Sequence, residues 1–291
     1  MMTYIQQIAD FLWGPQMLIF ILGSGIYFSI RLKWIQFRKF LPAIRSMRQS
    51  TISSGEGNIT PFQALMSALS GIVGNGNIAG VATAIVIGGP GAVFWMWLSA
   101  LILMATMYFE SWLGFTHRRK DADGTYLGGP MVYIEKGLGW KWLAVAFAFA
   151  FGVKTLLATT SIQSNSMSIA LHNQFRIPML LSCLVIGVLT WLVVIGGLRT
   201  IARTAQILVP FMTLLYLTAG IIILILNMER LPNALALIFK HAFTAASATG
   251  GFAGATVLMA LRYGAARGAY SNEAGTGSVA IMHATAQSGS P

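Results

Sequence analysis

Hydrophobic residues gather in seven long runs along this chain, and short polar segments separate the runs. A helix that crosses a bilayer needs about 20 mostly apolar residues, and each run approaches or exceeds that length. The pattern therefore predicts an all-α integral membrane protein. The predicted spans are residues 11–30, 62–88, 92–117, 142–170, 179–195, 205–227 and 235–261. A further stretch rich in small residues, 268–286, begins another element.

Basic residues mark alternate loops between these spans. Fifteen of the 19 lysines and arginines lie in residues 31–48, in residues 117–141, or at Arg199, Arg203, Arg262 and Arg267. Cytoplasmic loops of membrane proteins carry an excess of Lys and Arg. We therefore expect these four segments in the cytoplasm and the N-terminus outside.

Composition agrees with a membrane protein and argues against other classes. Hydrophobic residues make up 56% of the chain and charged residues only 9%, whereas globular domains carry about 25% charged residues. The net charge of +11 would also suit nucleic acid, but the positive charges lie in short clusters between apolar runs. That distribution is typical of loops beside an anionic leaflet, so we expect membrane lipid and no nucleic acid as a partner.

Glycine and asparagine interrupt the second predicted span. It contains Gly71, Gly74, Gly76 and Gly80, with Asn75 and Asn77 between them. A glycine costs a helix about 1 kcal/mol relative to alanine. Unwound backbone at membrane depth survives only where it faces protein or a watery cavity. The seventh span is interrupted in the same way, at Gly250, Gly251 and Gly254.

Two interpretations of these interruptions remain open. Gly76 and Gly80 form a small-xxx-small pattern, which usually serves close helix packing. The two broken spans also lie five spans apart, so they cross the membrane in opposite directions, as in the inverted halves of many secondary transporters. We favour a binding site, in which helix N–H groups would hold a carboxylate and C=O groups a cation. A zwitterionic amino acid with a small cation would suit these groups.

Polar side chains also occur in the fourth span. Gln163 and Ser166 are three residues apart and share a helix face, while Asn165 is turned away from Gln163. These residues either close over a substrate or are simply wetted at the outer end of the span. Lys154 lies about mid-span, where a charge costs at least about 2.5 kcal/mol. It could pair with Glu110, bond to backbone, carry a proton or stand in for a bound cation.

The sequence lacks the motifs of common enzyme classes. No P-loop, GxSxG, Ser-His-Asp set or pair of carboxylates appears, and the four histidines lack metal-ligand spacing. The single cysteine, Cys183, allows no intramolecular disulfide. We therefore expect that the protein is not an enzyme and that it has no cofactor and no resident metal ion.

Four motifs, in order, resemble those of the alanine or glycine:cation symporter family, the sodium:alanine symporters. They are G-N-G-N-I-A-G-V-A-T-A-I at 74–85, G-G-P-G-A-V-F-W-M-W at 88–97, G-G-P-M-V-Y-I-E-K-G-L-G at 128–139 and S-N-E-A-G-T-G-S at 271–278. The resemblance implies sodium-coupled import of small neutral amino acids, chiefly alanine and glycine, across the cell inner membrane. It also implies the inverted-repeat transporter fold of the amino acid–polyamine–organocation superfamily.

The resemblance further implies how the chain is divided and which residues bind. Residues 1–61 would form an extra N-terminal helix and a basic cytoplasmic loop, residues 62–230 the first five-helix repeat, and residues 231–291 the start of the second repeat. Expected substrate contacts are Asn75, Gly76, Asn77, Gln163, Asn165, Gly250 and Gly251, and expected cation contacts are Asn77 and Thr83. Sodium is the expected coupling ion, a small amino acid the substrate, and no obligate protein partner is evident.

Departures from the family pattern keep alternatives open. Asn75 replaces the family's usual Thr at the unwound turn, and Lys154 is not expected in this family. They leave a proton-coupled or uncoupled amino-acid transporter as an alternative. Family members continue through four more helices after the last motif, so we expect a second repeat that is truncated here, either by cropping or as a natural fragment. An inactive truncated relative is therefore a further alternative.

Overall fold

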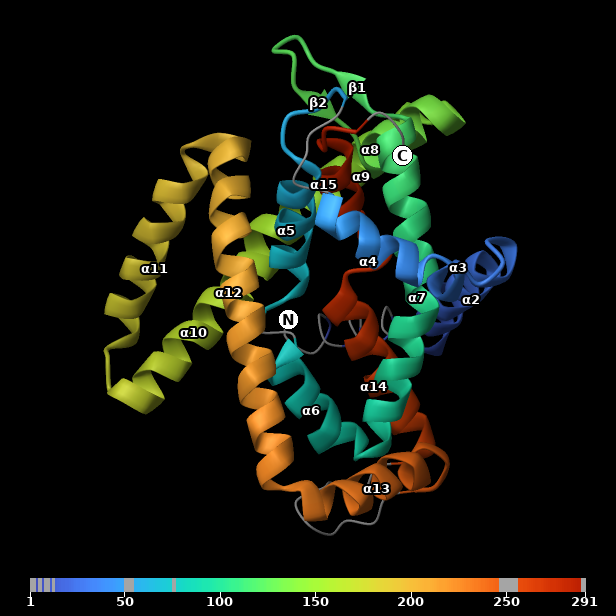
Figure 1. Cartoon of the computed structure of the whole chain (residues 1–291), viewed down its shortest axis with the longest axis vertical. Coiled ribbons are helices and arrows are strands. Elements are labelled where there is room, and N and C mark those ends of the chain that lie inside the picture. The colour runs from blue at the N-terminus through green and yellow to red at the C-terminus, as the bar shows by residue number, and fades with distance from the viewer. Residues whose placement is uncertain are drawn as a thin grey trace. The chain divides into compact units, whose positions relative to one another are not determined.

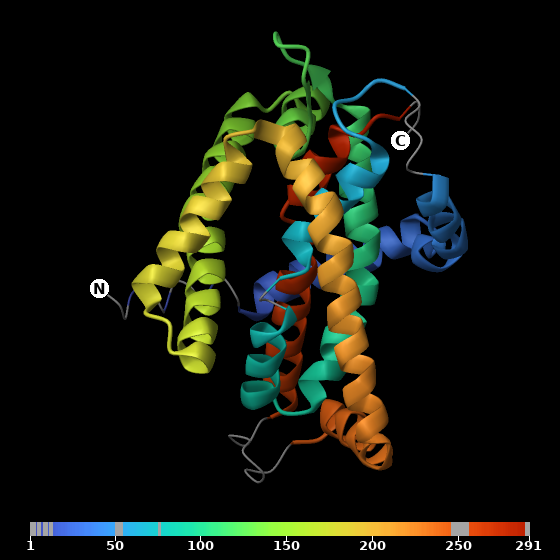
Figure 2. The same ribbon diagram turned by 60° about the vertical axis from the view of Figure 1, so that its left-hand side comes forward.

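The structure is a computed structural model, and it is mostly helical (Figures 1 and 2). It describes residues 14–49, 55–74, 77–245 and 256–288, together with Tyr4, Gln7 and Phe11. Packing divides the chain into two units. The first unit comprises Met1–Ser46, Gly76–Phe109 and Met212–Thr276, and the second comprises Met47–Asn75, Glu110–Phe211 and Gly277–Pro291.

The first unit is built from helices. It contains α2 (Pro15–Arg31), α3 (Ile35–Arg38), most of α4 (Phe40–Gln49), α6 (Ala79–Gly88), the short turn η4 (Met228–Arg230), α13 (Leu231–Phe243) and α14 (Val257–Asn272). Two long helices, α7 (Gly91–Thr116) and α12 (Gly197–Leu226), contribute residues to both units.

The second unit adds a small β-hairpin to its helices. The helices are α5 (Pro61–Ile72), α8 (Pro130–Tyr133), η2 (Ile134–Leu138), α9 (Lys141–Val153), η3 (Lys154–Thr159), α10 (Thr160–Phe175), α11 (Met179–Val194) and α15 (Ser278–Ala284). The segments η2 and η3 are π-helical turns. In the hairpin, β1 (Arg119–Lys120) pairs antiparallel with β2 (Tyr126–Leu127).

Small residues let α14 approach α7 closely within the first unit. A β-carbon on Gly264 would overlap the carbonyl oxygen of Ala92, and one on Gly268 would overlap the hydroxyl of Ser99. Gly264 and Gly268 are four residues apart, which is the spacing that brings membrane helices into close contact. The two helix backbones therefore touch along one face.

The second unit has its own packed contacts around α5. Met66 of α5 packs with Ala205 and Val209 of α12 in one buried cluster. The side-chain amide of Gln63 donates a hydrogen bond to the side-chain oxygen of Gln206 (2.9 Å). These contacts attach α5 to the first half of α12.

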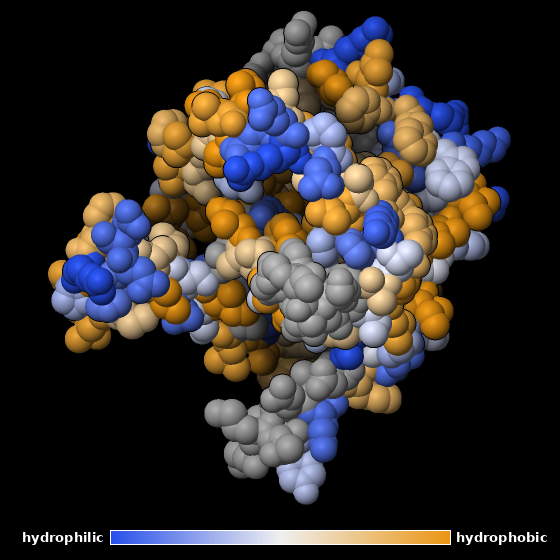
Figure 3. All heavy atoms as spheres, turned by 90° about the horizontal axis from the view of Figure 1, so that it is seen from below, coloured by the Kyte–Doolittle hydropathy of each residue, from blue (hydrophilic) through white to orange (hydrophobic). Residues whose placement is uncertain are grey.

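Three helices in the described part of the chain are long and apolar enough to cross a membrane. They are α7, the continuous helix Lys141–Phe175 made by α9, η3 and α10, and α12. Two shorter apolar helices are α6 and α11. Many apolar side chains on α11 and α12 are exposed, and apolar residues cover much of the face shown in Figure 3. So many exposed apolar side chains are typical of a membrane-embedded protein.

The seventh predicted span differs from the structure. Residues 235–261 cover most of α13, which ends at Phe243, and the first turn of α14, which continues to Asn272, while the predicted interruption at Gly250, Gly251 and Gly254 lies outside the described residues. Arg262 and Arg267 consequently lie inside α14, so the prediction that they mark a loop is wrong. The physical reason is composition: α14 is rich in Ala, Gly and Arg, which give a weak hydropathy signal even in a helix.

Candidate functional site

The second predicted span is broken in the structure, as its glycines and asparagines predict. Helix α5 ends at Ile72 and α6 begins at Ala79. Val73, directly after α5, has an extended backbone (φ −82°, ψ 95°). Ile78 precedes α6, and its aliphatic side chain cannot cap the helix, so the first N–H groups of α6 need an acceptor from elsewhere. A helix start of this kind attracts anionic groups such as carboxylates.

A second break lies within the S-N-E-A-G-T-G-S motif. Helix α14 ends at Asn272 and α15 begins at Ser278. Between them, Glu273 (φ 54°), Gly275 (φ 84°) and Gly277 (φ 78°) adopt left-handed backbone conformations. Glycine enters this region without steric cost, whereas for Glu273 the left-handed conformation carries a steric cost.

Local hydrogen bonds hold the backbone of this second break. The side-chain oxygen of Asn272 accepts the N–H of Ala274 (3.1 Å). The carbonyl oxygen of Glu273 accepts both the N–H (3.2 Å) and the hydroxyl (2.8 Å) of Thr276. The turn is therefore an organised structure and not a frayed helix end.

Within the first unit, α6 and α14 run side by side in opposite directions (Figures 1 and 2). A β-carbon on Gly88, at the end of α6, would lie 3.3 Å from the Met259 carbonyl oxygen and 3.3 Å from the β-carbon of Tyr263, near the start of α14. At the opposite end, the hydroxyl of Ser271 donates a hydrogen bond to the side-chain oxygen of Asn77. The start of α6 and the end of α14 therefore meet at these two polar side chains.

Within the second unit, α5 and α15 also pack in opposite directions. The N–H of Asn58, before α5, donates to the carbonyl oxygen of Thr285, after α15 (2.8 Å). The N–H of Gln287 donates in return to the carbonyl oxygen of Ile59 (2.8 Å). The two broken helices are thus paired half by half, α6 with α14 and α5 with α15.

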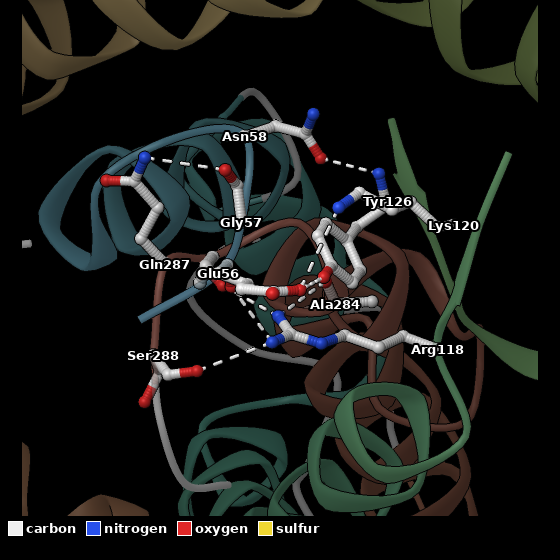
Figure 4. Close-up of polar contacts among 10 residues, drawn as sticks. Glu56, Gly57, Asn58, Arg118, Lys120, Tyr126, Ala284, Gln287 and Ser288 are labelled. Atoms are coloured by element: carbon white, nitrogen blue, oxygen red, sulfur yellow. Dashed lines mark hydrogen bonds and ion pairs between the residues drawn. The ribbon is translucent and has the colours of Figure 1, made fainter. Parts of the chain in front are cut away.

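One arginine ties the start of α5 to the end of α15, as Figure 4 shows. The guanidinium of Arg118 donates hydrogen bonds to the carbonyl oxygens of Glu56 (2.9 Å), Ala284 (3.3 Å), Ala286 (2.8 Å) and Ser288 (3.3 Å). The guanidinium carbon (Cζ) of Arg118 lies 4.4 Å from the centroid of the Tyr126 ring. We call these six residues the Arg118 cluster. A cation at the end of α15 also suits the negative end of the helix dipole.

The β-hairpin supports this cluster from the side. The hydroxyl of Tyr126 donates to the Glu56 carboxylate, and the Tyr126 N–H donates to the side-chain oxygen of Asn58 (2.7 Å). The ammonium of Lys120 lies 3.9 Å from the same carboxylate. Burial lowers the pKa of Arg118, and the Glu56 charge opposes this effect. Arg118 stays protonated at neutral pH because a guanidinium holds its proton far above that pH.

Gln163 of α10 lies beside the end of α5. A β-carbon on Gly74 would be 2.9 Å from the side-chain nitrogen of Gln163, so the glycine leaves room for the amide to approach the backbone. Gln163 is half-buried, whereas Asn165 is exposed on the same helix. The two predicted contacts of the fourth span therefore have different surroundings.

Lys154 begins the π-helical segment η3, in the middle of the long helix Lys141–Phe175. Its ammonium lies 5.7 Å from the centroid of the Phe151 ring, within the range of a cation–π interaction. π-Helical turns frequently occur at functional sites.

The remaining predicted contacts fall elsewhere. Thr83 is exposed one turn into α6, and its hydroxyl donates to the carbonyl oxygen of Ala79 on the same helix. Four of the predicted contacts lie outside the described residues: Asn75, Gly76, Gly250 and Gly251.

The sequence patterns above do not identify Ser271, Glu273 and Thr276 as residues of a broken helix. The motif at 271–278 resembles a family feature, and its unwinding is not among the predictions from the sequence. A signal was present, because Asn272, Gly275 and Gly277 repeat the mixture of asparagine and glycine that marks the first break.

The sequence model of the sodium:alanine symporter family matches residues 1–291. The chain belongs to this family. Members of the sodium:alanine symporter family are transporters and not enzymes. Together with the long apolar helices, family membership makes the chain a multi-pass membrane protein.

Several relatives within the family resemble the chain over nearly its whole length. The sodium/alanine symporter AgcS of Methanococcus maripaludis is 40% identical over 299 residues, which cover 99% of this chain and 64% of AgcS. The uncharacterized transporter YflA of Bacillus subtilis is 45% identical, with 100% of this chain and 62% of YflA covered. The probable sodium/glutamine symporter GlnT of the same organism is 38% identical, with 97% and 58% covered. This family member spans less than two thirds of the length of these relatives.

Proposed function

We propose that the protein imports small neutral amino acids, such as alanine and glycine, across the cell inner membrane together with sodium ions. The observation that carries this proposal is the antiparallel pairing of α6 with α14, with Asn77 and Ser271 where a helix start meets a helix end. A helix start attracts the carboxylate of an amino acid, and the carbonyl end of a helix attracts a cation.

The proposed substrate site uses groups from both of these helix ends. The N–H groups at the start of α6 bind the substrate carboxylate, since Ile78 offers them no side-chain cap. The sodium ion takes oxygen ligands from the Asn77 amide and from the hydroxyl and carbonyl groups around Ser271 and Thr276. Glycine-rich surroundings leave little space beside the substrate, which favours a small side chain.

The other contacts expected from the family resemblance remain part of the proposal. The substrate contacts are Asn75, Gly76, Asn77, Gln163, Asn165, Gly250 and Gly251, with Thr83 joining Asn77 at the cation. Among the substrate contacts that lie outside the first broken span, Gln163 has the best structural support, because its amide approaches the backbone beside Gly74.

We further propose the inverted-repeat fold, with residues 62–230 as the first repeat and residues 231–291 as the start of the second. Support comes from the two broken helices, because α5–α6 and α14–α15 run in opposite directions. In such transporters one repeat moves against the other to open the site to each side in turn. The Arg118 cluster joins α5 to α15, so we expect these two half-helices to move together.

A second candidate is coupling to protons in place of sodium. The observation that favours it is Lys154, a basic residue at a π-helical turn in a membrane helix. Lys154 is half-buried there, and ionisable residues inside membrane helices are costly and commonly mark ion or proton pathways.

The first prediction tests transport and its coupling ion. The protein, expressed from its whole gene and reconstituted in liposomes, should accumulate radiolabelled alanine when sodium is high outside, but not when choline replaces sodium. Asn77→Ala should lower sodium-driven uptake at least about tenfold, because a ligand of the ion and a bond to α14 are lost together. Asn173→Ala, which removes an exposed amide at the end of α10, is the matched control.

Each proposal has its own contrary result. Uptake that persists unchanged without sodium would exclude sodium coupling, and a pH gradient would then be tested as the driving force. If Lys154→Met kept full activity with an unaltered pH profile, the proton-carrier role would be wrong. Normal uptake by Asn77→Ala would show that the transport site does not lie at the start of α6.

A further inference from the structure

The motif at 128–139 has no part in the proposed transport site, yet it helps to line a hollow in the second unit. The hollow has a volume of about 400 Å3 and lies among β1, α8, η2 and α9. Its lining residues are Arg119, Met131, Val132, Glu135, Lys141, Ala144, Val145 and Ala148. This hollow is separate in the chain from the helix ends that we assign to transport.

The side of the hollow formed by α9 is charged at one end and apolar along its length. Lys141, Ala144, Val145 and Ala148 follow the spacing of a single helix face, with the lysine in the first turn. Beyond it the face is small and apolar for two turns, about 10 Å at the rise of an α-helix. Met131 and Val132 extend the apolar lining from α8. An elongated ligand with a charged head and an apolar tail matches this surface.

The charged end carries an excess of positive charge. A guanidinium nitrogen of Arg119 lies 3.4 Å from a carboxylate oxygen of Glu135, and both side chains are partly exposed. Lys141 is exposed and adds a second cation. Two cations against one carboxylate favour an anionic head group, and basic pockets beside membrane helices bind such head groups.

Aromatic side chains place this end at the level of lipid head groups. Trp140 and Trp142, on either side of Lys141, are 53% and 71% exposed. Tryptophan concentrates at the boundary between water and hydrocarbon. Farther along α9, Val145 and Phe149 are 62% and 75% exposed, so the helix offers apolar surface next to the hollow.

We infer that this hollow is a binding site for an anionic phospholipid. The phosphate lies between Lys141 and Arg119, and one acyl chain follows Ala144, Val145 and Ala148. A free phosphate would use the two cations but would leave the apolar lining uncovered, so a lipid is the occupant that fits the whole hollow.

The experiment measures lipid binding by the purified protein in detergent. Native mass spectrometry gives the dissociation constant of dioleoylphosphatidylglycerol, and dioleoylphosphatidylcholine supplies the same chains with a neutral head group. We expect Lys141→Gln to weaken phosphatidylglycerol binding about fivefold, since one basic residue near a membrane surface contributes about that factor. Ala148→Trp fills the apolar end and should abolish the preference for this lipid while both cations remain.

A matched control and a competitor separate the alternatives. Arg45→Gln removes a positive charge from the exposed face of α4 and should leave phosphatidylglycerol binding unchanged. If Arg45→Gln and Lys141→Gln weakened phosphatidylglycerol binding equally, overall charge would explain the effect and the proposed site would be wrong. Equal affinity for the two lipids would overturn it as well. Displacement of the lipid by inorganic phosphate, with Ala148→Trp behaving as wild type, would identify an anion site without a lipid chain.

Discussion

At the scale of single residues, the bond between Asn77 and Ser271 connects two helix ends that belong to distant parts of the chain. A hydrogen bond between neutral groups contributes only about 0.5–1.5 kcal/mol to stability. Its importance lies in orientation, because an amide that donates or accepts one bond has its other groups directed elsewhere. Ser271 holds the Asn77 side chain and so decides where the rest of its amide points.

The second prediction compares the two amides of the fourth span. Gln163→Ala should reduce alanine uptake about five- to twentyfold, because it removes an amide beside the backbone at Gly74. Asn165→Ala should reduce uptake less than twofold, since Asn165 is exposed on a different face of α10. Initial rates of uptake at several alanine concentrations would measure both effects. Equal losses in the two variants would contradict the difference in surroundings that the structure describes.

At the scale of elements, the Arg118 cluster makes α5 and α15 a connected pair. Four backbone carbonyl groups from two segments share one guanidinium, and the Tyr126 ring stacks against it. Arginine suits this role because its donors are fixed in a plane and it remains charged. A change at this residue therefore acts on two half-helices at once.

The third prediction concerns the stability of this connection. Arg118→Gln should lower the unfolding temperature by several degrees, because hydrogen bonds to a charged group contribute about 1.5–3 kcal/mol each before solvent exposure is considered. Lys120→Gln, which removes the exposed ion pair to Glu56, should change it by less than about 2 °C. A fluorescence-based unfolding assay in detergent gives both values. If Lys120→Gln were as destabilising as Arg118→Gln, net positive charge would be the cause and not the carbonyl contacts.

The two broken helices differ in how far sequence could reveal them. In the first, Gly and Asn interrupt a strongly apolar run, so the contrast predicts the break between Ile72 and Ala79. In the second, α14 is itself rich in Ala and Gly, so the asparagine and glycines from Asn272 onward contrast less with the residues before them. The contact between Asn77 and Ser271 depends on tertiary packing across 194 residues and follows from no local pattern.

At the scale of the whole molecule, the distribution of basic residues still predicts how the protein crosses the membrane. The structure removes Arg262 and Arg267 from the loops, but residues 31–48 and 117–141 keep eleven basic residues. Arg199 and Arg203 lie in the first turns of α12. Because basic loops alternate with other loops, these two residues are expected on the same side of the membrane as residues 117–141. We therefore keep the expectation that the β-hairpin is cytoplasmic.

The fourth prediction tests this orientation with single cysteines. In a Cys183→Ser background, Asp123→Cys at the exposed turn of the hairpin should react with an impermeant maleimide only after the cells are opened. Asn173→Cys, at the exposed end of α10, should react in intact cells. The reverse labelling pattern would show that the protein crosses the membrane in the opposite orientation.

The close contact between α14 and α7 also has a consequence for the order of assembly during synthesis. The face of α7 that contains Ala92 and Ser99 receives Gly264 and Gly268 only after roughly 170 further residues have been made. At ribosomal speeds of about 5–20 residues per second, that takes on the order of 10 to 30 s. During this interval α7 lies in the bilayer, and lipid or a temporary helix partner contacts the face that contains Ala92 and Ser99. Completion of the first unit is therefore timed by a helix that leaves the ribosome long after α7.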